Sequence, residues 1–113
     1  MITYLSTNKT AIEYAKSIID DKELFKYLNL WFSPTLYLND AKLDEQFECS
    51  IHTFIFRSNH RFNQLTEQEQ NTAIDWITTE IIREADCNQI DNVAKVTYHP
   101  TEQKLQIQLL GYW

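Results

Sequence analysis

The fold is decided by the stretch TEQEQNTAIDWITTEIIREA, residues 66–85. Thr66 and Glu69 have the spacing of a capping box, in which each side chain accepts a hydrogen bond from the other residue's backbone N–H. Apolar residues then recur every three or four positions, at Ile74, Ile77, Ile81 and Ala85. This stretch predicts a long amphipathic helix that ends near Ala85 and buries one face.

Strand signals lie on both sides of this helix. The preceding stretch FECSIHTFIFR (47–57) is rich in β-branched and aromatic residues. Because apolar groups occupy both of its alternating faces, we expect a strand that is central in its sheet or covered on both sides. After the helix, Val93–Tyr98 and Leu105–Leu110 alternate in polarity around the turn-forming segment 99–103, which predicts a C-terminal β-hairpin.

The N-terminal third combines a short strand with helical segments. Ile2–Leu5 is β-prone, and the capping-box spacing of Thr10 and Glu13 predicts a helix from about Ala11. Helical apolar spacing continues to Phe32 across a break at Asp20-Asp21, which predicts two helices or one kinked helix.

Proline is expected to end that helical region. Ser33-Pro34 removes a backbone donor and biases the preceding residue toward extended geometry. Leu36–Leu38 then predicts a short strand, and the polar segment Asn39–Gln46 predicts a loop.

These elements together predict one α+β domain over residues 1–113. We expect a mainly antiparallel sheet of about four or five strands, with the helices packed on one face. No apolar run approaches the ~20 residues that cross a bilayer, and the N-terminus lacks the pattern of a secretory signal. We therefore expect a cytoplasmic protein with Cys49 and Cys87 as reduced thiols.

The formal net charge of -6 is unevenly distributed along the 113 residues. Residues 67–91 hold seven acidic residues and one arginine, whereas residues 1–66 have seven basic and eight acidic residues. Residues 92–113 add two lysines and one glutamate, so the long helix and its exit loop carry the whole excess. Such a charge disfavours direct binding to nucleic acid.

Trp76 gives this acidic helix an apolar group on its outer side. A helical wheel centred on Ile74, Ile77 and Ile81 places Trp76 about 140° away. A ring of acids around an aromatic anchor is typical of a binding site for a basic protein. The alternative is a solvated helix face, with Trp76 covered by the second helical segment or by the C-terminal tail. The candidate partner-binding residues are Trp76, Glu69, Glu80, Arg83, Glu84 and Asp86, with Asp40, Asp44 and Glu45 from a second acidic stretch.

Sequence motifs for catalysis are weak or missing. The single glycine, Gly111, cannot build a phosphate loop or a dinucleotide fingerprint, and the three histidines lack zinc-site spacing. His60 or His99 with nearby carboxylates would be needed for a hydrolase or nuclease. The segment Ser58–Arg61 is interpreted as a turn. We therefore expect no enzyme, no metal and no cofactor.

The charge pattern favours a small acidic inhibitor of the immunity-protein, antitoxin or anti-defence type. Such a protein would neutralise a basic partner, for example a nuclease toxin or a nucleic-acid-binding complex, by covering its functional surface. We expect a monomer or weak homo-oligomer that binds neither nucleic acid nor membrane directly. The alternative is a structural or assembly subunit of a phage particle or secretion apparatus, which would self-associate through strand edges and the hairpin.

Overall fold

The chain folds into one five-stranded sheet with helices against it. The structure is a computed structural model that describes residues 2–5, 9–20, 25, 28–44, 49–87 and 92–112. In chain order its elements are β1 (Thr3–Leu5), α1 (Lys9–Asp20), the 3-10 turn η1 (Leu28–Leu30), β2 (Phe32–Asp44), β3 (Cys49–Ser58), α2 (His60–Asn63), α3 (Glu67–Cys87), β4 (Asn92–His99) and β5 (Lys104–Tyr112).

The sheet has the strand order β1-β2-β3-β5-β4 and is antiparallel except at one edge. β1 pairs in parallel with β2, which α1 permits by returning the chain between two strands that run the same way. β3 occupies the centre, where Phe54 lies opposite Tyr37 of β2 and Ile107 of β5. β4 and β5 form the expected antiparallel pair, joined through residues 100–103.

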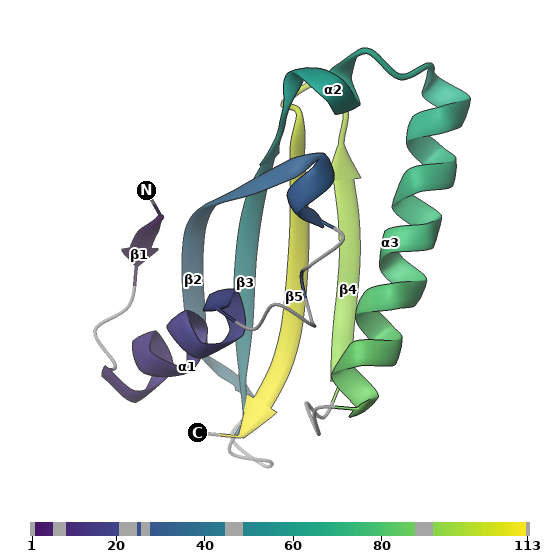
Figure 1. Cartoon of the computed structure of the whole chain (residues 1–113). Coiled ribbons are helices and arrows are strands. Elements are labelled where there is room, and N and C mark those ends of the chain that lie inside the picture. The colour runs from purple at the N-terminus through teal and green to yellow at the C-terminus, as the bar shows by residue number, and fades with distance from the viewer. Residues whose placement is uncertain are drawn as a thin grey trace.

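The helices cover one face of this sheet (Figure 1). α1 packs toward β2, and α3 runs beside β4 at the other edge. Between them, Phe25 meets the rings of Phe54 and Phe56 edge to face, at centroid distances of 5.7 and 5.3 Å. The expected α+β architecture is thus confirmed.

A single core fills the space between the sheet and the helices. Every second residue of β3 and β5 points into it, as the period of a strand requires. The buried apolar residues are Ala15, Ile18, Phe25, Leu28, Phe32, Tyr37, Phe54, Phe56, Phe62, Ala73, Ile77, Ile81, Leu105, Ile107 and Leu109.

The other face of the sheet has no cover from any element in the described ranges. Ile51 and Ile55 of β3 are only half-buried there, and Leu5 of β1 is 53% exposed. Of the two alternatives expected for this strand, central or covered on both sides, the first is confirmed, because β3 is central and the described elements cover one of its faces. Antiparallel sheets commonly leave one face in water, and the apolar groups on this one are mixed with threonine and glutamine.

Two expectations for residues 24–46 were wrong. Residues 21–24 and 26–27 of the second helical segment lie outside the described residues; of the described ones, 28–30 form the single turn of η1, and Phe32 already begins β2. β2 continues to Asp44, through most of the segment predicted to be a loop. Asn39 pairs with His52 and Asp40 with Ile51, so the pairing with β3 overrides the low strand propensity of Asn and Asp.

Pro34 lies inside β2 because its surroundings need no donor at that position. β1 pairs with β2 only from Leu36 onward, so β2 is still an edge strand at Pro34. The register shifts between Pro34 and Leu36, and the Thr35 hydroxyl donates a hydrogen bond to the Ile55 carbonyl at 3.1 Å. Edge positions and bulges are where strands tolerate proline.

The ends of the helices were predicted less accurately than their positions. α1 begins at Lys9, two residues before the expected start, and the Thr10 side chain lies outside the described residues. The segment Ser58–Arg61, interpreted as a turn, instead enters the short helix α2. Asn59 is its N-cap and accepts a hydrogen bond from the Phe62 N–H at 3.0 Å.

Candidate functional site

The helix that carries the acidic charge begins at a complete capping box. The Thr66 N–H donates to Glu69 Oε1 at 2.9 Å, and the Glu69 N–H donates to Thr66 Oγ1 at 3.2 Å. Hydrogen bonding to the Thr66 backbone, and then to its side chain, lowers the pKa of the Glu69 carboxyl. Glu69 is therefore held in place and ionised at the first turn, where the helix dipole also favours an anion.

α3 is rotated relative to the helical wheel predicted from its isoleucines. The buried line runs through Ala73, Ile77 and Ile81, whereas Ile74 is only half-buried. At 100° per residue, Trp76 lies about 100° from the centre of this line, nearer the core edge than predicted. Trp76 is 41% exposed, so one part of its indole contacts the protein and another part is open.

Trp76 contacts Trp31, the residue between η1 and β2. Their ring centroids are 6.2 Å apart and the planes meet at 82°. Trp31 also lies edge to face with Phe62 of α2, at 6.4 Å. The alternative in which the second helical segment covers Trp76 is thus realised in part, since Trp31 contacts the indole without enclosing it.

Backbone hydrogen bonds fix Trp31 in this position. Its N–H donates to the Leu28 carbonyl at 2.9 Å, which closes the turn of η1. Its carbonyl accepts from the Asn59 N–H at 2.7 Å, and the Asn59 side chain donates to the Leu30 carbonyl at 2.9 Å. Asn59 therefore both caps α2 and holds the chain that carries Trp31.

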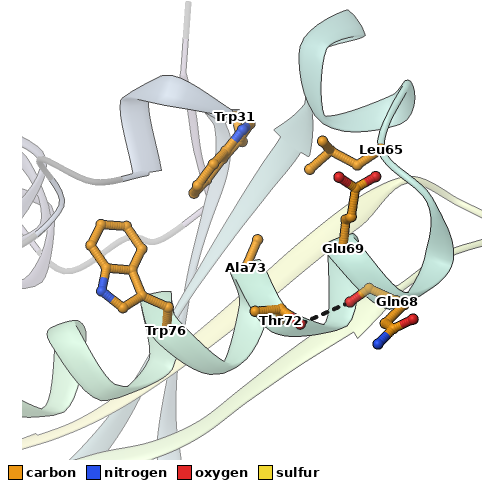
Figure 2. A pocket seen from close by; sticks show the side chains of 7 residues that line it. All are labelled: Trp31, Leu65, Gln68, Glu69, Thr72, Ala73 and Trp76. Atoms are coloured by element: carbon orange, nitrogen blue, oxygen red, sulfur yellow. Dashed lines mark hydrogen bonds between the residues drawn. The ribbon is translucent and has the colours of Figure 1, made fainter.

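A surface groove lies between Trp31 and α3. It has a volume of about 460 Å³, and we name it the Trp groove after its two indoles (Figure 2). Ala73 lies at its base, and the carboxylate of Glu69 projects toward Leu65 across from the tryptophans. Its lining residues are Trp31, Leu65, Gln68, Glu69, Thr72, Ala73 and Trp76.

Sequence reasoning identified only part of this groove. Trp76 and Glu69 were predicted site residues, whereas Trp31, Leu65 and Ala73 were not among them. A groove between segments distant in sequence leaves no spacing signal. The small Ala73, at the N-terminal end of the buried line that Ile77 and Ile81 continue, was the available hint.

Glu80, Arg83 and Glu84 form an ion-pair group one to two turns beyond Trp76. Arg83 donates from Nε to Glu80 Oε2 at 3.2 Å, and its terminal nitrogen Nη2 lies 3.2 Å from Glu84 Oε1. Glu84 is buried, because the rotation of α3 turns it toward the core. The presence of Glu80 and Glu84 near the helix C-terminus, which the dipole disfavours, is thus explained by Arg83.

The other predicted site residues lie elsewhere or outside the described part. Asp40 and Asp44 belong to β2, three strand spacings or about 14 Å from β4, the strand beside α3. The side chains of both residues and of Asp86 are outside the described residues, as is all of Glu45. The Trp groove with Glu69 is therefore the part of the predicted site that the structure brings together.

The remaining polar residues give no second candidate centre. Within the described ranges, no three His, Cys, Asp or Glu residues lie close enough to hold a metal ion. His60 is exposed and bonds to Gln64, its Nε2 lying 2.8 Å from the amide nitrogen. None of the helices described is long and apolar enough to span a bilayer.

Function must accordingly be argued from the groove and its charge. Apolar walls and one ionised carboxylate are features of a binding site. No protein-family model, curated protein or solved structure matches this chain.

Proposed function

We propose that this protein binds a basic protein through the Trp groove and the exposed acids of α3. By covering the partner's cationic surface it would act as an inhibitor of the immunity-protein, antitoxin or anti-defence type. One observation carries the proposal: a 41% exposed tryptophan borders an apolar groove on the helix segment that holds the chain's net charge.

The charges supply attraction and the groove supplies the anchor. Glu67, Glu69 and Asp75 are exposed on α3, and no ion pair in the described part of the chain neutralises them. Summed over the helix, such charges steer a cationic partner and raise the association rate, an effect that salt screens. Burying a tryptophan in a desolvated contact then slows dissociation, as expected for hot-spot residues.

Glu80 and Glu84 contribute less to recognition than their sequence positions suggest. Both are bound to Arg83, and Glu84 is withdrawn from solvent. Charge reversal at Glu84 would bury an unpaired cation and unfold the protein rather than test binding. Variants of exposed acids give the cleaner test.

The experiment is capture of partners on the immobilised protein, followed by identification and an inhibition assay on the purified partner. Trp76→Ala and a Glu67→Lys, Glu69→Gln pair should each reduce capture at least about tenfold. Ile82→Ala is the matched control, because Ile82 is 45% exposed on the opposite side of the same helix.

Three results would refute this function. The first is capture that is equal for Trp76→Ala and Ile82→Ala, both folded. The second is capture that does not weaken between about 50 and 500 mM salt. The third is a captured partner whose activity is unchanged when it is bound.

A second candidate, the structural or assembly subunit, is favoured by the uncovered sheet face. Half-buried Leu36, Leu38 and Ile55 lie together there with the exposed Leu5 at the β1 edge. This candidate requires self-association through that face, whereas the inhibitor requires a free Trp groove.

A further inference from the structure

Besides two indole N–H donors, the Trp groove presents acceptor oxygens at Glu69 and Thr72, and these require donors on a ligand. Glu69 is an ionised carboxylate, and only its Oε1 is used, by the Thr66 N–H. The Thr72 hydroxyl donates its proton to the Gln68 carbonyl at 3.0 Å, so its oxygen can only accept a further bond. Figure 2 shows the Gln68 amide directed away from the tryptophans. A ligand group that enters the groove must therefore supply donors.

The apolar part of the groove adds a second requirement. The two indoles meet nearly at right angles, so they form an angled wall instead of stacking and hiding both faces. An exposed indole face attracts a cation that lies over it, and a planar guanidinium stacks on it as well. The groove's volume of about 460 Å³ lies in the lower part of the roughly 300–1,000 Å³ range of binding pockets. It would take one or two side chains.

These two requirements select an arginine side chain. Arginine has five donors and no acceptor, a planar cation and an alkyl stem that can cover Ala73 and Leu65. Lysine supplies a compact, strongly hydrated charge that stacks less well, and the neutral ring of Phe, Tyr or Trp would leave the ionised Glu69 without a cation.

We propose that the Trp groove binds one arginine side chain of the partner, stacked on the indole wall and hydrogen-bonded to Glu69. This inference rests on the proposed function, because it names the chemistry by which the same surface would recognise a basic protein. An inhibitor of this kind would occupy an arginine that its partner uses on phosphate groups.

The test is an NMR titration of the full chain with the peptide acetyl-Gly-Arg-Gly-amide. The indole N–H resonances of Trp31 and Trp76 should shift saturably, with half-saturation in the millimolar range. The citrulline peptide, which has the same shape without the charge, should give no saturable shift. The lysine peptide should bind at least about threefold more weakly.

Two variants test the residues. Glu69→Gln keeps an acceptor for the capping box, so the helix start is preserved, but the variant should bind the arginine peptide at least about threefold more weakly. Trp76→Leu should weaken binding by a similar factor. Glu13→Gln is the control, because Glu13 is an exposed acid of α1 that does not line the groove.

Equal binding of the citrulline peptide, equal binding of the lysine peptide, or a Glu13→Gln effect as large as that of Glu69→Gln would overturn the arginine site. The proposed function fails by a different result. If partner capture depends on Trp76 but the arginine peptide does not bind, the arginine inference is wrong and the binding function stands. If capture is independent of Trp76, the function itself is wrong.

Discussion

His52 is a buried side chain whose charged form the fold disfavours. It is fully buried on β3, with its Nδ1 2.6 Å from the Tyr37 hydroxyl and its ring 4.8 Å from that of Tyr14. Desolvation lowers the pKa of His52 from 6.5 to about 4. The unfolded chain therefore binds a proton at a higher pH than the folded one, and stability falls as the pH drops through this window.

This residue gives the first prediction, a pH dependence that belongs to one side chain. Between pH 7 and pH 4.5, protonation of His52 in the unfolded chain should lower the free energy of unfolding by about 2–3 kcal/mol. His52→Gln should flatten this part of the profile in urea unfolding, whatever its effect at pH 7. A wild-type and His52→Gln pair with parallel profiles would contradict the pKa assignment.

Gln103 has a backbone conformation that suits glycine better than glutamine. Its φ of 55° lies in the left-handed region, and its carbonyl accepts from the Ser58 N–H at 3.0 Å. Gln103→Gly keeps that carbonyl and should stabilise the protein by about 0.5–1 kcal/mol. Gln106→Gly, within β5, should cost about the same amount. Thermal unfolding of the two variants should shift in opposite directions, and shifts of the same sign would disprove the argument.

Among the elements, α3 depends on its N-terminal cap. Thr66→Ala removes the acceptor for the Glu69 N–H and should lower unfolding free energy by about 1 kcal/mol. The Thr79 hydroxyl donates to the Asp75 carbonyl one turn back, a bond that adds little to a helix. Thr79→Ala should therefore be neutral or slightly stabilising, since alanine is the better helix former. Urea unfolding of both variants separates the two roles, and equal losses would contradict the cap.

The elements also show what the sequence could predict. α3, β3 and the β4–β5 pair have strong local signals: a capping box, β-branched runs and alternation around a turn. β2 could not be delimited, because Asn39 and Asp40 are strand residues only through their partners on β3. The apolar spacing around η1 likewise suggested a helix that continues to Phe32. In the structure Phe32 belongs to β2, and its ring packs against that of Phe62 with the centroids 4.7 Å apart.

The candidate site likewise contains residues that the sequence could identify and residues that it could not. Glu69 could be identified from its capping position, and Trp76 from its departure from the apolar line. Trp31 could not, because its place beside Trp76 depends on Asn59 and α2, neither of which has a spacing relation to α3. Glu84 was predicted as a partner-binding residue but is buried. The centre of the buried side of α3 lies about 30° from the predicted centre, nearer Ala73 than Ile74, and this turns Glu84 toward the core.

At the scale of the whole molecule, the two sides differ in character. One side holds α3 with its acids and the Trp groove. The uncovered sheet face holds half-buried apolar residues and, toward one end, a cross-strand row of exposed Arg57, Lys104 and His99. Like charges directly opposite each other weaken a sheet by a few tenths of a kcal/mol. If two copies of the protein stacked these faces with their strands in parallel, the positive charges of one copy would lie against those of the other and would oppose the contact.

This asymmetry gives the last prediction, that the chain stays monomeric. A net charge of -6 repels a second copy, and an antiparallel sheet can leave this much half-buried apolar surface in water. Sedimentation velocity from about 5 to 300 µM should show one species, and Ile55→Lys, in the middle of the open face, should leave it unchanged. The contrary result would be oligomers that form as the concentration rises and persist at about 500 mM salt. If these oligomers disappear in Ile55→Lys but not in Trp76→Ala, the sheet face is the interaction surface. The structural subunit would then replace the inhibitor, because an interface that excludes salt is apolar and the Trp groove would have no part in it.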